Sequence, residues 1–292
     1  MHDKSRLAFV ALLTGAVGIA FAPVFVRLSE VGPSATAFYR LLLALPVLWL
    51  WRIHERTRPG ATPNPASSKE HLQLAVAGLL FAGDLALWHW SIKLTSVANA
   101  TLFANFAPIF VTLGARLLFG ERIRPSFIGA LALALAGAAL VVGVSLRLTV
   151  EHVLGDALAL GAAVFYGGYM LCVKHLRRTF STATILAWSG LASVAGLLLA
   201  ALLSRESLLP ADSRGWLVLI ALALVSQVLG QGLIAHAFAH LPVSFSSLSL
   251  LLQPAVAALL AWFILHESLR PLQIVGGCVI LGGIALATRA SR

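Results

Sequence analysis

Long apolar stretches recur along almost the whole chain, and they constrain the fold more than any other feature of this sequence. A helix needs roughly 20 mostly apolar residues to cross the hydrocarbon core of a bilayer. Inside lipid the backbone must satisfy its own hydrogen bonds, which favours helices. The sequence therefore predicts an all-α integral membrane protein with ten transmembrane helices, which cover 7–28, 34–51, 71–92, 96–119, 126–146, 153–173, 182–203, 214–238, 243–265 and 271–288.

The composition supports a membrane protein. Hydrophobic residues make up 59% of the chain and charged residues only 11%, with a mean hydropathy of +0.92. Soluble domains carry about a quarter charged residues, so water would be a poor solvent for this chain. Cys172 and Cys278 both lie in apolar stretches, which makes a disulfide framework unexpected. The first apolar stretch is too long for a signal peptide and is expected to be a retained span.

The basic residues give an orientation. The formal net charge is +10, but no basic segment alternates with aromatic residues, so we expect no nucleic-acid partner. Lys and Arg gather instead in the connections, thirteen on the side of the two termini and six on the other. Cytoplasmic loops carry the excess of Lys and Arg, so both termini and the 52–70 connection are expected in the cytoplasm. We expect a multi-pass protein of a bacterial inner membrane.

The chain is internally repeated. Shifting it by 146 residues aligns its two halves without a gap. Five spans per half is an odd number, so the second half must enter the membrane upside down. The expected domains are a first repeat at 1–146 and a second, inverted repeat at 147–292, the architecture of alternating-access transporters. Residues that coincide in the two halves include Pro108 with Pro254, Glu121 with Glu267, Pro125 with Pro271 and Gly137 with Gly283.

The paired segments resemble a known family. NATLFANFAPIFVTLGARLLFGERIRPSFIGALALALAGAALVV and its later counterpart SSLSLLLQPAVAALLAWFILHESLRPLQIVGGCVILGGIALAT are similar to the EamA family of the drug/metabolite transporter superfamily. The resemblance implies a secondary transporter that exports amino acids, aromatic ones included, or similar small metabolites. A multidrug or nucleotide-sugar carrier of the same superfamily is the alternative. His266 stands where the first repeat has a glycine before its glutamate, which suggests that the halves are not functionally equivalent.

Two opposite charges lie at similar depth within apolar stretches. Asp84 is in the third span and Arg40 in the second, both toward the outer ends. Intramembrane charges are normally paired or face a watery cavity. We therefore expect a structural ion pair between Arg40 and Asp84, or a shared cavity. Neither charge recurs in the second repeat, where Leu186 is equivalent to Arg40 and Gly230 to Asp84, so the shared fold does not require the pair.

Uncharged polar side chains mark the remaining site candidates. Amide side chains in lipid need hydrogen-bond partners, which places them either between helices or against the substrate. Tyr166 and Tyr169 could equally pack against neighbouring helices or bind a ligand. Midspan prolines with polar neighbours are typical of flexing helices around a transport site. The expected substrate-binding residues are Trp88, Asn105, Tyr166, Tyr169, Gln227, Gln231, Gln253 and Asp84, and the expected helix kinks lie at Pro23, Pro108 and Pro254.

Other functions are less compatible with the sequence. We expect no enzyme, no metal and no cofactor, because paired carboxylates, metal-ligand spacing and a G-x-x-x-x-G-K-[ST] motif are absent from the sequence. The expected partners are a small-molecule substrate and the lipid bilayer. A monomer is one interpretation of the oligomeric state, which the sequence leaves open. Proton coupling through Asp84, His89 or His236 and uncoupled facilitated diffusion also remain open. Glu121 and Glu267 are interpreted as charges that order the loops joining spans four to five and nine to ten.

Overall fold

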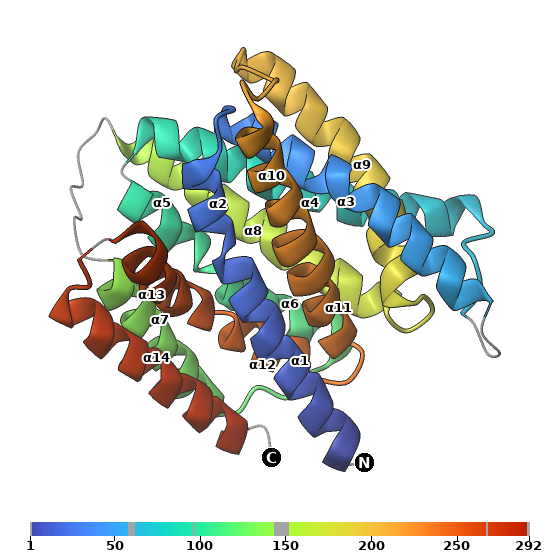
Figure 1. Cartoon of the computed structure of the whole chain (residues 1–292). Helices are drawn as coiled ribbons and strands as arrows, with labels where there is room; N and C mark the ends of the chain where they lie inside the picture. The colour runs from blue at the N-terminus through green and yellow to red at the C-terminus, as the bar shows by residue number, and fades with distance from the viewer. Residues whose placement is uncertain (1, 58–61, 96, 143–151, 267, 291–292) are drawn as a thin grey trace.

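A computed structural model describes residues 2–57, 62–95, 97–142, 152–266 and 268–290, and these residues form a bundle of helices (Figure 1). Within these described ranges, ten helical segments are long and apolar enough to span a membrane, which confirms the predicted number. The elements are α1 His2–Ala20, α2 Ala22–Leu28, α3 Pro33–Arg56, α4 Ser68–Leu94, α5 Val97–Ala104, α6 Ala107–Phe119, α7 Pro125–Val142, α8 Val153–Leu176, α9 Thr182–Ser204, α10 Ser213–Ala221, η2 Leu222–Gln231, α11 Gly232–Ala237, α12 Val243–Ser249, α13 Leu252–Leu265 and α14 Pro271–Ala290.

Three spans are broken near their middles. Pro23 is the second residue of α2, Pro108 the second of α6, and Pro254 the third of α13, so each begins a new helix partway through the membrane. Proline has no N–H and its ring clashes with the preceding turn, whereas both effects are harmless in the first turn of a helix. Span 8 changes geometry instead of breaking, because its middle third, η2, is a ten-residue π-helical segment. Wide turns of this kind are rare and often lie at functional sites.

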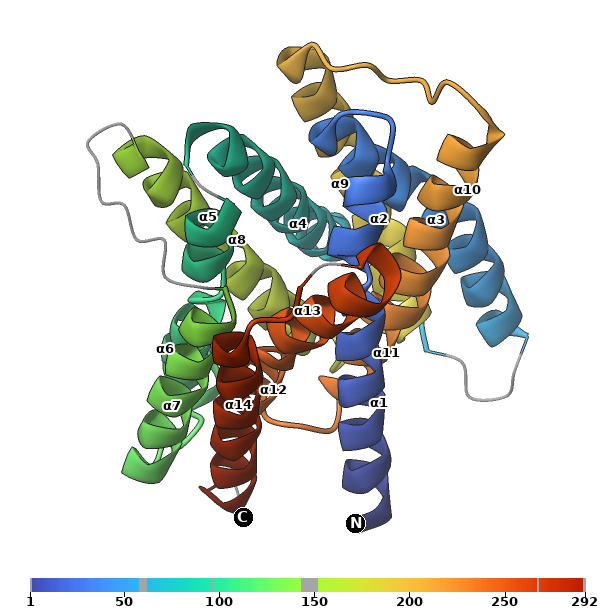
Figure 2. The same cartoon turned by 60° about the vertical axis from the view of Figure 1, so that its left-hand side comes forward.

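The packing of the helices follows the internal repeat. In the first half α4 packs against α8 and α9; in the second half the equivalent span, built from η2 and α11, packs against α1 and α3. Three further pairs, α7 with α14, α3 with α9, and α6 with α12, join equivalent spans to each other. Because this pattern is unchanged when the halves are exchanged, the fold is the predicted pair of inverted five-helix repeats. Both termini lie on the same side, at the bottom of Figure 2, and this side is called the terminal side below.

The two repeats end their fourth and ninth spans in the same way. Gly120 follows α6 with a φ of 66°, and His266 follows α13 with a φ of 55°. Both are therefore left-handed caps, a conformation that glycine adopts easily and histidine does not. The backbone conformation of the cap is preserved although its residue differs, and a functional difference between the repeats stays a prediction.

Glu121 does more than order its own loop. Its carboxylate accepts hydrogen bonds from the backbone N–H groups of Val243 and Ser244, at the start of α12 in the other repeat. The loop interpretation of Glu121 was therefore incomplete, because the residue joins the two halves of the molecule. Glu267, its equivalent, lies outside the described residues.

Candidate functional site

A cavity of about 240 Å³ lies between the two repeats. Its walls come from α1 and α2, the first turns of α3, the second half of α4, the end of α5 with its junction to α6, α8, η2 and α13. These segments all lie near the middle of the bundle or on the side away from the termini. The lining residues are Ile19, Ala20, Ala22, Pro23, Val26, Thr36, Ala37, Arg40, Phe81, Asp84, Leu85, Trp88, His89, Thr101, Ala104, Asn105, Tyr166, Leu222, Gln231, Gln253, Pro254 and Ala257.

The two charges predicted to meet both line this cavity. Arg40 is only 7% exposed, and its Nε donates a 3.0 Å hydrogen bond to Oε1 of Gln227. Its guanidinium carbon lies 5.7 Å from the centre of the Phe81 ring, a cation–π contact. Asp84 interacts with Arg40 electrostatically, but within the described part of the chain no ion pair of 4 Å or less joins them. The guanidinium is thus held by an amide and a ring, and the carboxylate faces the cavity.

A stack of aromatic rings runs from this wall into the layer behind it. The rings of Phe81 and Tyr169 stack with their centres 4.7 Å apart, and Tyr166 stacks on Tyr169 at 6.2 Å. Tyr169 is 1% exposed, and its hydroxyl accepts a 3.2 Å hydrogen bond from Nε2 of Gln231. Stacked aromatic rings have few rotatable bonds and pack tightly, so this layer fixes the positions of Arg40 and Gln231.

The predicted site residues fall into two groups. Most of them share the cavity, whereas Tyr169 and Gln227 lie one layer back, where each holds a lining side chain. Pro108 is buried in α6 away from the lining. The predicted residues that line the cavity are Asp84, Trp88, Asn105, Tyr166, Gln231, Gln253, Arg40, Pro23 and Pro254.

Two of the amide side chains in the lining differ in their hydrogen-bond partners. Asn105 sits at the break between α5 and α6, and its Nδ2 donates a 2.9 Å hydrogen bond to the carbonyl of Thr101. Nε2 of Gln253 is buried and has no partner among the described residues. A buried donor of this kind calls for a water, an ion or a ligand. Gln253 is therefore the lining amide whose hydrogen bonding the protein alone leaves incomplete.

Sequence reasoning missed Phe81 and Leu85 as lining residues. Both belong to the helical face that carries Asp84 and Trp88, because residues spaced by three, four and seven share one side of a helix. That spacing could have identified them. Trp90, outside the lining, donates a 2.9 Å hydrogen bond from Nε1 to the hydroxyl of Ser204.

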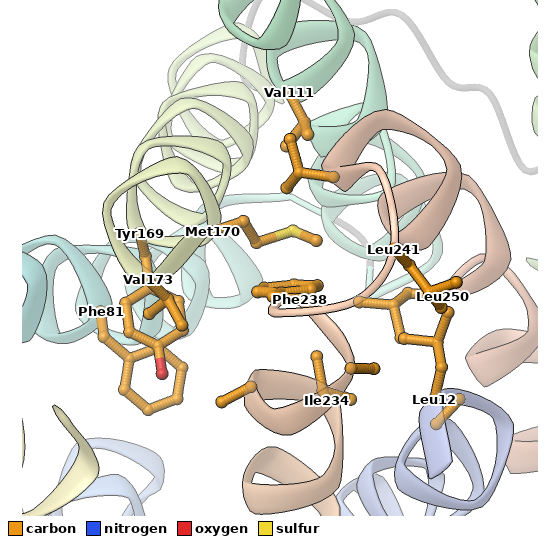
Figure 3. Close-up of a cluster of buried hydrophobic side chains, with 14 of the residues drawn as sticks. Leu12, Phe81, Val111, Tyr169, Met170, Val173, Ile234, Phe238, Leu241 and Leu250 are labelled. Atoms are coloured by element: carbon orange, nitrogen blue, oxygen red, sulfur yellow. The ribbon is translucent and has the colours of Figure 1, made fainter. Parts of the chain in front are cut away.

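A plug of apolar side chains closes the cavity toward the terminal side. Figure 3 shows Met170 reaching toward the Phe238 ring, with Ile234 below and Leu241 and Leu250 beside it. Leu12 of span 1 and Val111 of span 4 complete this plug, and its seven named side chains are at most 8% exposed. The cavity therefore lies on the far side of a tightly packed apolar layer from the termini.

The comparison with known families decides the identity of this fold. The profile of the EamA-like transporter family matches residues 6–143 and again residues 153–289. The chain belongs to the EamA-like transporter family. The two matches fall on the two halves of the internal repeat. Among the described residues of this chain, no group of three His, Cys, Asp or Glu side chains is placed to hold a metal ion.

Several proteins related to this EamA-like chain carry names that indicate transport. An "Uncharacterized transporter" of Archaeoglobus fulgidus is 27% identical over 285 residues, which cover 97% of each chain. The "Pseudopaline exporter CntI" of Pseudomonas aeruginosa is 27% identical over 221 residues, 75% of each chain. The "Probable terminal-alkyne amino-acid exporter" of Streptantibioticus cattleyicolor is 30% identical over 213 residues, 70% of this chain and 68% of that protein. The family and these names indicate a multi-pass membrane transporter.

A solved crystal structure has the same fold. It superposes with a TM-score of 0.83 at 21% identity and covers 100% of this chain and 99% of its own. At that identity the likeness shows the fold alone, and the substrate must be argued from the cavity.

Proposed function

We propose that the protein exports amino acids or similar small metabolites across a plasma membrane by alternating access through the central cavity. The observation that carries this proposal is the position of the cavity, between two inverted repeats and lined by both. Sites at the repeat interface, near the midplane, are where such transporters bind their substrates. Two relatives with export in their names, for pseudopaline and for a terminal-alkyne amino acid, support the direction and the kind of substrate.

The chemistry of the lining suits a small polar molecule with an apolar body. Amides from Asn105, Gln231 and Gln253 offer donors and acceptors, and Trp88 and Tyr166 offer an aromatic wall. Cavities that bind small molecules combine such a wall with a few fixed polar groups. A nucleotide sugar would need more positive charge for its phosphates than Arg40 supplies, so an amino acid fits this lining better.

The excess of Lys and Arg supports a cytoplasmic terminal side and thus an outward-facing state. The cavity then lies toward the outside, and the apolar plug separates it from the cytoplasm. Breaks beside Pro23, Pro108 and Pro254 give spans 1, 4 and 9 places to bend as the cavity changes sides. We place the protein in a bacterial inner membrane, with residues 1–146 and 147–292 as its two repeats.

A substrate screen with purified protein in proteoliposomes tests this function. Vesicles loaded with single labelled amino acids should release them faster with the protein than without it, with and without an imposed pH gradient. Release that is faster only under the pH gradient would show that transport is coupled to protons. Release of a nucleotide sugar but of no amino acid would contradict the proposal.

A further inference from the structure

The charged part of the cavity suggests which ends of a substrate it recognises. The described lining includes one basic guanidinium, that of Arg40 from the first turns of α3, and one carboxyl group, that of Asp84 from α4. The carboxylate is half-buried and faces the cavity, and the guanidinium is almost completely enclosed. A fixed charge of each sign in one small cavity is costly in a membrane unless a function requires it.

The guanidinium is held in a way that leaves its outer edge available. Gln227 takes the Nε hydrogen, and Phe81 covers one face of the group. Within the described residues no hydrogen bond occupies the two terminal nitrogens. These nitrogens form the fork that binds a carboxylate through two parallel hydrogen bonds. Arg40 is therefore preorganised to receive a carboxylate from the cavity side.

Asp84 supplies the complementary group. A carboxylate accepts hydrogen bonds only, and its natural partner in a substrate is an ammonium group. A zwitterion brings one anionic and one cationic end, so neither protein charge is left buried and unpaired when it binds. An amine alone would leave Arg40 without a carboxylate, and a carboxylic acid alone would leave Asp84 without an ammonium.

We propose that Arg40 and Asp84 select zwitterions, with Arg40 binding the α-carboxylate and Asp84 the α-ammonium group of an amino acid. This inference rests on the proposed function and names the part of the substrate that the cavity reads. The aromatic and apolar wall then faces the side chain of the bound amino acid, and the cavity discriminates less between different side chains than between different charged ends.

Competition binding to the purified protein tests the proposal with matched compounds. Phenylalanine, phenethylamine and 3-phenylpropionate share a phenyl group and differ in the charged ends, as do leucine, isoamylamine and 4-methylpentanoate. Each amino acid should bind roughly 10- to 100-fold more tightly than its amine or its acid, because a hydrogen bond to a charged group is lost in each case. Equal affinities of the three members in both series would overturn the inference.

Substitutions assign the two ends separately. Arg40→Gln should remove the preference for phenylalanine over phenethylamine, which lacks the carboxylate. Asp84→Asn should remove the preference for phenylalanine over 3-phenylpropionate, which lacks the ammonium group. Arg116→Gln, which neutralises an exposed arginine on α6, should change neither preference. Should Arg40→Gln fail to fold, the wild-type comparison alone still decides. If amino acids are transported but amines compete equally, the charge assignment fails and the proposed function stands.

A second, independent observation concerns the closure of the cavity. Phe238 and Leu241, which belong to the plug, lie on the connection between α11 and α12. Nζ of Lys174, near the end of α8, donates 2.7 Å hydrogen bonds to the backbone carbonyls of both residues. The lysine thus holds the segment that carries the plug.

Glu121 holds the same connection from its other end. Its carboxylate accepts hydrogen bonds from the N–H of Val243 at 3.0 Å, the N–H of Ser244 at 3.4 Å and the Ser244 hydroxyl. Lys174 and Glu121 also attract each other electrostatically. Hydrogen bonds to charged groups are among the stronger ones in proteins. Access from the terminal side requires the plug to move, and these bonds oppose that movement.

We infer that Lys174 and Glu121 form the latch that keeps the cavity closed toward the terminal side. The reporter for this latch is Val111→Cys, fully buried in the plug, in a Cys172→Ser, Cys278→Ser background. Maleimide labelling of this cysteine in detergent should be slow. Glu121→Gln or Lys174→Met should accelerate labelling roughly tenfold or more. Arg122→Gln, an exposed change in the same loop, should not.

Two controls separate gating from general loosening. Ala130→Cys, fully buried on α7 away from the plug, should stay protected in all variants. Joining Glu121→Cys to Ser244→Cys with a short bifunctional thiol reagent should stop transport, whereas either single cysteine should not. Unchanged labelling of Val111→Cys, or transport that continues with the cross-link complete, would overturn the latch.

Discussion

Arg40 and Gln227 join the two repeats at the cavity wall: Nε of the arginine on α3 donates a 3.0 Å hydrogen bond to Oε1 of the glutamine on η2. Gln227 is 2% exposed, so water cannot easily replace it. This one contact orients the positive charge of the cavity and ties the π-helical segment to span 2.

Gln227→Leu should therefore destabilise the protein and weaken transport together. The substitution leaves a charged donor buried without its acceptor, which costs roughly 1.5–3 kcal/mol. The midpoint of thermal unfolding in detergent should fall, and the affinity for the transported amino acid should fall with it. Leu224→Val, on the exposed face of the same segment, is the matched control. An unfolding midpoint equal to that of the control would show that the bond contributes nothing.

His266→Gly should stabilise the protein. His266 holds a left-handed backbone conformation with φ 55°, whereas the equivalent cap in the first repeat is Gly120. The left-handed region costs a non-glycine residue about 1 kcal/mol, and the His266 side chain is exposed. The unfolding midpoint should rise with transport unchanged, and the reverse substitution, Gly120→His, should lower it. A lower midpoint for His266→Gly would mean that the imidazole makes a stabilising contact.

Alanine substitutions at two glycines of α7 should have opposite effects on the unfolding midpoint. A Cβ added at Gly137 would lie 2.7 Å from the backbone nitrogen of Ile280 on α14, whereas one added at Gly129 would meet nothing within 4 Å. Gly137→Ala should force the paired helices apart and lower the unfolding midpoint. Gly129→Ala should raise it slightly, since alanine favours a helix over glycine by about 1 kcal/mol. Equal shifts for both would contradict the close packing of α7 on α14.

The orientation can be tested in intact cells. Lys69 and Ser207 are exposed at opposite ends of the bundle. In a background without the natural cysteines, a membrane-impermeant maleimide should label Ser207→Cys in whole cells, and Lys69→Cys only after the cells are opened. The opposite pattern would place the termini outside and reverse the assignment of the cavity as outward-facing.

The sequence was sufficient for the architecture because its signals are local or periodic. Apolar length predicts the ten spans, and a constant shift of 146 residues pairs positions such as Pro108 and Pro254 without any tertiary information. The direction of the second repeat then follows from the odd number of spans. The exact ends of the spans differ by a few residues, as for α3, which continues to Arg56 rather than residue 51.

The layering of the site depends on tertiary packing and could not be predicted in the same way. Tyr166 and Tyr169 are three residues apart on one helix and look equivalent in sequence. Tyr169 is buried because it stacks on Phe81 of α4, and Tyr166 is left to line the cavity. Likewise, nothing near Arg40 in the sequence identifies Gln227, 187 residues away, as its partner.

Transport by three cavity variants tests the central claim most directly. Trp88→Ala, Tyr166→Ala and Gln231→Ala each remove a side chain from the wall that is assigned to the substrate. Reconstituted at equal amounts, they should release labelled phenylalanine or leucine from proteoliposomes with altered rate or affinity, whereas the lipid-facing control Trp262→Ala should match the wild type. Release with wild-type rate and affinity by all three variants would contradict the account and place the substrate path outside this cavity.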